Sequence, residues 1–288
     1  MRRSDSLEQP LRASLDASRP RPAPVAAERR IGRRVTARRF DIMAARAASI
    51  AAFFLLWWLG TLWFGPRLCP DPVSVFGFVV REAASGELPY HLGVTLLRVA
   101  AAFLIAMTAG TLIGLAMGRS ERANTVLEPW LILLLNAPAL IIIVLAYIWI
   151  GLSETAAILA VALNKIPNVT VTLREGARAM EPAYMEMAQV YRFSRKSIYR
   201  DIMLPQLLPY LAAAARSGLS LIWKIVLVVE LLGRSNGVGF QIHLYFQMFD
   251  VRAILGYTMA FVAVMLAIEF LAVQPTEARA YRWRSRPA

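Results

Sequence analysis

The sequence predicts an all-α, polytopic membrane protein with about six transmembrane helices. Of its 288 residues, 58% are hydrophobic and only 18% are charged, whereas a soluble domain is about 45–50% apolar. Six apolar blocks are each about long enough to cross roughly 30 Å of hydrocarbon. Basic residues outnumber acidic ones in the N-terminal tail and in the intervals 119–122 and 174–206, as expected for segments on the cytoplasmic side of a membrane.

The composition also excludes several other classes of protein. We assign the formal net charge of +13 to membrane orientation and not to nucleic acid, because no basic stripe is interleaved with aromatic residues. A single cysteine, Cys69, allows neither an intrachain disulfide nor a cysteine metal cluster. The two histidines, His91 and His243, are too few and too far apart to indicate a metal site. We therefore predict neither a catalytic residue nor a metal ligand.

Residues 1–46 form a basic tail with twelve arginines, five acidic residues and several prolines. This composition predicts a mostly disordered cytoplasmic segment. An uncharged block at about 47–65 is the first span of a transmembrane domain that we place at 47–288. The interval 66–91 has two basic and three acidic residues and an early run of prolines. It is predicted to be a loop on the outer side.

The second span, at about 92–118, contains a row of small residues. Gly110 and Gly114 form a Gly-xxx-Gly step, and Ala106 and Gly118 extend the row at the same spacing. Such a row lets another helix approach closely, either within the subunit or at a subunit interface. The short basic loop that follows is expected in the cytoplasm.

The third span, at about 126–150, is interrupted in its middle by Asn136-Ala-Pro138. Proline removes a backbone hydrogen bond there, so a kink or a break is expected. The fourth span, at about 155–173, contains Lys165. A lysine in the middle of a span is costly in lipid, so it should face a cavity or a partner.

The last third of the chain contains two further spans. The fifth span, at about 208–232, carries Lys224 and Glu230. Residues 233–252 form an outer segment that we expect to contain a short interfacial helix, and the sixth span covers about 253–273. A basic C-terminal tail follows, so both termini are predicted to be cytoplasmic.

Charged residues and helix breaks inside spans often mark a translocation path. The candidates here are Asn136, Pro138, Lys165, Lys224 and Glu230. The two lysines suit the passage of an anion. The alternative is that they pair with Glu230 or with backbone carbonyls, or extend along the helix to reach the membrane interface.

The interval 174–206, with six basic and four acidic residues, falls on the cytoplasmic side of this topology. Its polar, helix-prone stretch resembles the EAA coupling loop of ABC-importer permeases. That loop reads Glu-Ala-Ala, three residues, Gly, nine residues, then Ile-x-Leu-Pro. The spacing here is the same, although Met187 replaces the first alanine and Arg192 replaces the glycine. The predicted ATPase-coupling residues are Glu186, Met187, Ala188, Tyr191, Arg192, Leu204 and Pro205.

Similarity to the nitrate/sulfonate/taurine-type permeases extends over about residues 88–284. This resemblance implies the type I ABC-importer transmembrane-domain fold in a bacterial inner membrane. It implies two copies of a cytoplasmic ABC ATPase that bind ATP and Mg²⁺, a periplasmic or lipid-anchored solute-binding protein, and a second permease copy, expected as a homodimer. It also implies a small and mostly anionic solute such as a sulfonate, taurine or nitrate. We expect no cofactor in this chain, which has no Gly-x4-Gly-Lys-Ser/Thr phosphate loop.

Arg192 is the main departure from the coupling-loop pattern. The family glycine ends the first helix of the loop through a left-handed backbone conformation, where arginine costs on the order of 1 kcal/mol unless the turn moves. Ser194 offers an N-cap for the next helix. We expect the loop to present an apolar face to a groove on the ATPase, with Glu186 at its rim or in a capping contact. The apolar side chains are those of Met185, Met187, Ala188 and Tyr191.

Two alternatives remain. An ion-coupled secondary transporter would also explain charged groups and broken helices inside the membrane, but it leaves the Glu186–Pro205 segment without a role. Uptake driven by a proton gradient and not by ATP would favour this transporter. The second alternative is that the segment is an ordinary cytoplasmic connector between two spans.

Overall fold

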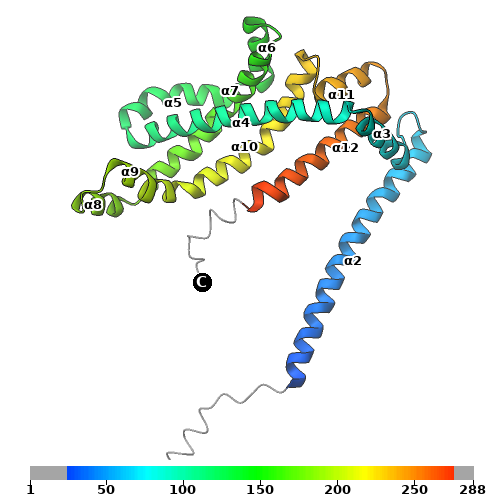
Figure 1. Ribbon diagram of the computed structural model, residues 1–288, viewed down its shortest axis with the longest axis horizontal. Helices are drawn as coiled ribbons and strands as arrows, with labels where there is room; N and C mark the ends of the chain where they lie inside the picture. The colour runs from blue at the N-terminus through cyan, green and yellow to red at the C-terminus, as the bar shows by residue number, and fades with distance from the viewer. Residues whose placement is uncertain (1–24, 276–288) are drawn as a thin grey trace, which may run out of the picture. The chain divides into compact units, whose positions relative to one another are not determined.

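The computed structural model describes residues 25–275 of the chain, with side chains from residue 43 onward. The described residues form helices joined by turns, without a strand, and they divide into two units, Met1–Gly60 and Thr61–Ala288 (Figure 1). The helices are α2 Val25–Phe64, α3 Pro72–Ser85, α4 Glu87–Arg119, α5 Glu121–Asn136, α6 Ala139–Ile150, α7 Glu154–Arg178, α8 Pro182–Val190, α9 Arg195–Ser197, η1 Ile198–Met203, α10 Leu204–Gly233, α11 Val238–Gln247, α12 Val251–Ile268 and η2 Glu269–Val273.

Five helical stretches in the described part of the chain are long and apolar enough to cross a membrane. They are Met43–Phe64, Glu87–Arg119, Glu154–Arg178, Arg195–Gly233 and Val251–Val273. The pair α5 and α6 gives a sixth if it is one span, bent by 100°. The bend falls at Ala137 and Pro138, which both have extended backbone. The predicted interruption of the third span is therefore confirmed as a break between two helices.

The first unit differs from its prediction. Helix α2 begins at Val25, not near residue 47, so residues 25–46, expected to be mostly disordered, are helical. Residues 1–24 of the predicted tail lie outside the described residues. From Met43 to Phe64 the helix is long and apolar enough to cross a membrane.

Helix α3 replaces much of the loop predicted at 66–91. Asp71 caps it by accepting a hydrogen bond from Ser74 N at 2.9 Å, which holds the pKa of Asp71 below its ordinary value. Pro72 occupies the first helical position, where a missing N–H costs nothing. Gly86, at φ +89°, ends α3 in the left-handed conformation, and α4 then begins at Glu87, five residues before the predicted span. The prolines that suggested a loop are therefore partly a helix-start signal.

The glycine row on α4 packs against α7 of the same chain. A Cβ on Gly110 would lie 2.6 Å from Val169 Cβ, and one on Gly114 would lie 2.6 Å from the Thr170 carbonyl oxygen. Only glycine allows backbones this close. This row therefore serves packing within the chain.

Replacing Gly114 by Ala should lower the free energy of unfolding by about 1–3 kcal/mol, because its Cβ meets backbone that cannot move aside. Thermal unfolding in lipid nanodiscs measures the effect. Gly93→Ala on the same helix is the matched control, since nothing lies within 4 Å of its Cβ position. That control should be neutral or slightly more stable. Equal stabilities for the two variants would contradict the tight α4–α7 contact.

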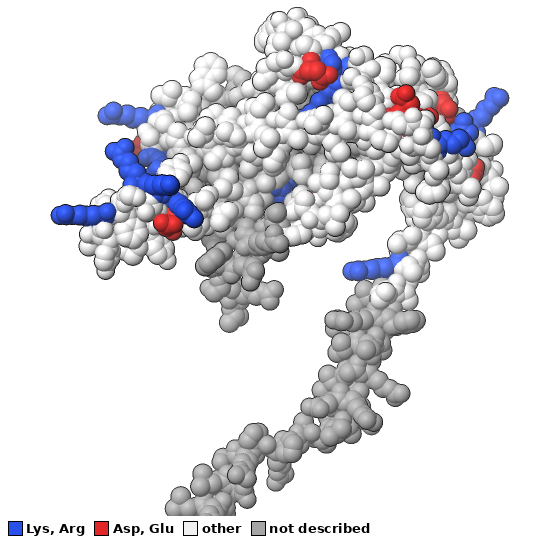
Figure 2. Space-filling view, in the orientation of Figure 1, with Lys and Arg blue, Asp and Glu red and all other residues white. Residues whose placement is uncertain are grey.

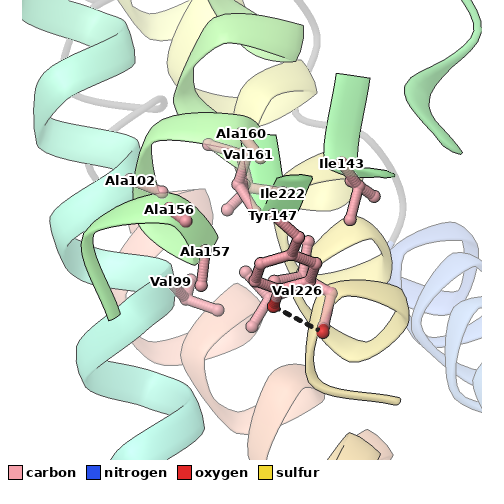
Figure 3. Close-up of a cluster of buried hydrophobic side chains, with 11 residues drawn as sticks. Val99, Ala102, Ile143, Tyr147, Ala156, Ala157, Ala160, Val161, Ile222 and Val226 are labelled. Atoms are coloured by element: carbon pink, nitrogen blue, oxygen red, sulfur yellow. Dashed lines mark hydrogen bonds between the residues drawn. The ribbon is translucent and has the colours of Figure 1, made fainter. Parts of the chain in front are cut away.

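A buried apolar cluster joins α4, α6, α7 and α10 (Figure 3). Tyr147 of α6 lies beside Val226 of α10 in this cluster, and its hydroxyl donates to the carbonyl oxygen of Val229 at 2.9 Å. The bond satisfies the polar end of a side chain that is only 9% exposed. Helix α6 is thus fixed to the bundle after the break, although few of its other side chains are buried.

Candidate functional site

The segment 182–205 contains α8, a tight turn, α9, η1 and the start of α10. It is named the coupling segment after the role that its sequence predicts. Figure 1 shows α8 and α9 at one end of the second unit, and α3 and α11 at the other. The backbone N–H of Glu181 donates to Gln206 Oε1 at 3.0 Å, which ties the two ends of the segment together. Ile202 and Met203 are buried and anchor it to the bundle. The segment is therefore fixed to the helical bundle by a hydrogen bond between its ends and by buried side chains.

Arg192 adopts the left-handed conformation itself, at φ +52°. Phe193 N donates to Ala188 O at 2.9 Å, and Arg192 N donates to Gln189 O at 3.1 Å. These two bonds form a Schellman motif in which the position usually taken by glycine is Arg192. The turn therefore stays where the resemblance places it. Ser194 caps α9 by accepting from Ser197 N at 3.2 Å, as predicted.

Replacing Arg192 by Gly should stabilise this turn by about 1 kcal/mol, because glycine enters the left-handed region without steric cost. The amide hydrogen of Phe193 should then exchange with solvent about fivefold more slowly, as measured by hydrogen–deuterium exchange. Arg200→Gly, in the helical part of the same segment, is the matched control and should have the opposite effect. Faster exchange at Phe193 in Arg192→Gly would mean that the left-handed turn is not strained.

The exposed face of α8 differs in part from the predicted one. Met187 and Tyr191 are exposed, at 40% and 71%, and Glu186 is exposed as well. Ala188 is only 1% exposed and packs into the chain itself, so it does not present apolar surface to a partner as predicted. Val190, which was not predicted, is 78% exposed and completes the apolar face. Leu204 and Pro205 are exposed where α10 begins.

The structure places the five candidate path residues at separate positions. Asn136 and Pro138 are exposed at the α5–α6 break. Lys165 is 2% exposed and its stem lies against Gly218 of α10, so it does not face lipid, as expected. Lys224 is exposed and lines a cleft between α10 and α12 that does not include Lys165. Glu230 is fully buried.

Glu230 belongs to a cluster of charged groups centred on Arg98 of α4, which is itself only 3% exposed. Arg98 binds Glu154 of α7 with two bonds, Nε to Oε2 at 2.8 Å and Nη2 to Oε1 at 2.6 Å. Its Nη1 donates to Glu230 Oε1 of α10 at 2.7 Å. Arg234 adds a second cation on Glu154. Two arginines thus balance two glutamates and connect three helices.

The turn after α10 closes over Glu230. The N–H of Gly239 donates to Glu230 Oε2 at 2.8 Å, and the Thr95 hydroxyl lies 3.0 Å from the same oxygen. A Cβ at Gly239 or at Gly237, where φ is +105°, would overlap the Glu230 side chain. The partner of Glu230 is therefore Arg98 and neither of the predicted lysines. An arginine inside the apolar second span is the sequence signal that could have indicated this cluster.

His91 extends the same buried region with a defined tautomer. Gly237 N donates to His91 Nδ1 at 2.9 Å, so Nδ1 carries no proton and Nε2 carries one. Nε2 lies 2.6 Å from the side-chain amide of Gln241, whose oxygen otherwise has no partner among the described residues. The amide should therefore be turned so that this oxygen accepts from His91. A neutral histidine thus holds the turn against α4.

The sequence matches a family model described as binding-protein-dependent transport system inner membrane component over residues 106–274. It is 31% identical over 196 residues to the putative aliphatic sulfonates transport permease protein SsuC of Bacillus subtilis, covering 68% of this chain and 70% of that protein. It is 27% identical over 230 residues to the taurine transport system permease protein TauC of Escherichia coli, covering 77% and 82%. The bicarbonate transport system permease protein CmpB of Synechococcus elongatus is 26% identical over 207 residues, covering 68% and 74%.

Solved structures share the fold at low sequence identity. The crystal structure of an amino acid ABC transporter with histidines has a TM-score of 0.57 at 18% identity, covering 70% of this chain and 98% of that chain. An inward-facing MetNI methionine ABC transporter has a TM-score of 0.52 at 16% identity, covering 64% and 93%.

Proposed function

We propose that this chain, which belongs to the family of binding-protein-dependent transport system inner membrane components, couples ATP hydrolysis by a separate ATPase to the import of a small anion. It is a multi-pass ABC-importer permease with the type I transmembrane-domain fold. The observation that supports coupling is the coupling segment itself, where a Schellman turn and buried anchors hold the exposed face of α8 at one end of the second unit.

The face of α8 suits a groove on a soluble partner. Met187, Val190 and Tyr191 supply exposed apolar surface, and Glu186 lies beside them as a charge that can fix register. Figure 2 supports the topology, because mostly basic side chains gather at the end of the second unit that carries α8 and α9, whereas basic and acidic side chains are mixed at the other end. The coupling segment is then cytoplasmic, and both chain termini are on the same side.

The names of the relatives support the proposed solute class. Their names refer to sulfonates, taurine and bicarbonate, each of which carries a negatively charged group. A solute-binding protein would deliver the anion at the outer ends of the helices. Two ATPase copies, which bind ATP and Mg²⁺, would engage the coupling segments of this chain and of a second permease copy. Nucleic acid is not among the proposed partners.

Replacing Glu186 by Lys should release the ATPase, because the change reverses a charge at the rim of the proposed interface. Co-purification of an affinity-tagged chain with its ATPase from membranes measures this. The amount of chain in the membrane should stay unchanged, since Glu186 is exposed and no hydrogen bond or ion pair of its side chain occurs among residues 43–275. ATPase retained at the parent level would argue against coupling through α8.

A further inference from the structure

A cleft between α10 and α12 lies apart from the coupling segment and has no role in the proposed coupling to the ATPase. Its volume is about 780 Å³, within the range of sites for small organic molecules. One wall is the stripe of α10 from Ala213 to Leu227, and the other is the stripe of α12 and η2 from Thr258 to Glu269. The lining residues recur about every three or four positions along each helix, so each helix turns one face to the cleft.

The charges in the cleft favour an anion. Arg216 and Glu269 form an ion pair at 3.5 Å, so these two charges balance each other. Lys224 is exposed in the cleft, and between residues 43 and 275 no hydrogen bond or ion pair engages its Nζ. Lys224 is therefore the lining cation for which the described residues supply no ion pair. A charge within a span is costly in lipid, and where one occurs it often marks a functional site.

The rest of the lining favours a ligand with an apolar body. The hydroxyls of Ser217, Ser220 and Thr258 already donate to carbonyl oxygens of their own helices. They offer little to a strongly hydrated inorganic ion. Most other side chains around the cleft are aromatic or aliphatic, namely Trp223, Leu227, Phe261, Val262, Met265 and Leu266.

We propose that this cleft binds an organic anion, with Lys224 holding the anionic group and the apolar walls of α10 and α12 holding an alkyl or aryl portion. The site would therefore prefer an alkanesulfonate to bicarbonate. This inference rests on the proposed function, which gives the direction of transport. The binding site that it assigns lies in this chain and not in the solute-binding protein. Recognition in the cleft would add a second selection step after the solute-binding protein.

The test measures binding of methane-, ethane-, propane- and butanesulfonate to the purified chain in nanodiscs by isothermal titration calorimetry. Burial of each added CH₂ contributes enough to tighten binding about fourfold. Lys224→Met should weaken every member of the series by about tenfold or more, and Lys224→Arg should restore binding, because the attraction depends on the cation in a medium of low dielectric constant. Lys196→Met, an exposed lysine outside the cleft, is the matched control and should bind like the parent.

Several results would overturn the proposal. These are affinity independent of chain length, equal affinity in Lys224→Met, bicarbonate binding as tight as butanesulfonate, or no binding by the parent chain. A phospholipid that co-purifies with the parent and is lost in Lys224→Met would instead identify a lipid as the occupant. Co-purification of the ATPase with Lys224→Met separates this inference from the proposed function, since coupling through α8 can stand while the cleft assignment fails.

Discussion

Replacing Arg98 by Met should lower the free energy of unfolding by about 3–5 kcal/mol, the largest effect on stability that we expect from one substitution. Arg98 is the cation on the fully buried carboxylate of Glu230, at 2.7 Å, and it also makes two bonds with Glu154. Without it Glu230 remains buried as an unpaired charge, and the fixed positions of α4, α7 and α10 are lost together. Thermal unfolding in nanodiscs measures the change.

Arg178→Met is the matched control, because Arg178 is an exposed arginine in a surface pair with Glu175 at 3.6 Å. Such a pair contributes about 0–1 kcal/mol. The double variant Arg98→Met with Glu230→Met should recover part of the loss, since it removes the unpaired anion as well. If Arg98→Met were as stable as Arg178→Met, the buried cluster would not connect the helices as described.

Replacing Val190 by Asp should weaken ATPase binding by about thirtyfold or more, the largest functional effect that we expect. Val190 is the most exposed large apolar side chain of α8, and burying a carboxylate in an apolar groove costs about 2 kcal/mol or more. The dissociation constant of the purified ATPase for the chain in nanodiscs measures this, and solute-dependent ATP hydrolysis should fall with it.

Val73→Asp provides the matched control. Val73 is 80% exposed, close to the 78% of Val190, but it lies on α3 at the other end of the second unit. It should bind the ATPase like the parent chain. Equal loss in both variants would indicate a general effect of the added charge, and no loss in Val190→Asp would exclude α8 as the contact.

The local features were predictable because their causes lie close together in sequence. Pro138 breaks a helix through its own missing N–H, and Ser194 caps the helix that follows it. The glycine row on α4 was recognisable as a packing surface, although its partner was not. Helix α3 was missed because the same prolines that disfavour a helix interior also begin one, and Asp71 before Pro72 was not read as a cap.

The features that were missed depend on tertiary structure. Arg98, Glu154 and Glu230 are far apart in sequence, and only the packing of α4, α7 and α10 brings them together. The direction in which Ala188 faces could not be read from a helix of nine residues, because Met187 and Ala188 are both apolar. Glu230 was predicted to line the translocation path because it is a charged residue inside a span. Its burial under the turn at Gly237 and Gly239 gives it a structural role.

The most direct test of the central claim, coupling to a separate ATPase, is uptake of labelled taurine or alkanesulfonate by proteoliposomes that contain the chain, its ATPase and its solute-binding protein. We predict that uptake requires ATP on the side of the ATPase, stops when the ATPase is replaced by a variant unable to hydrolyse ATP, and is lost in Val190→Asp. Uptake that persists with the inactive ATPase and collapses with the proton gradient would contradict the account and would identify an ion-coupled carrier.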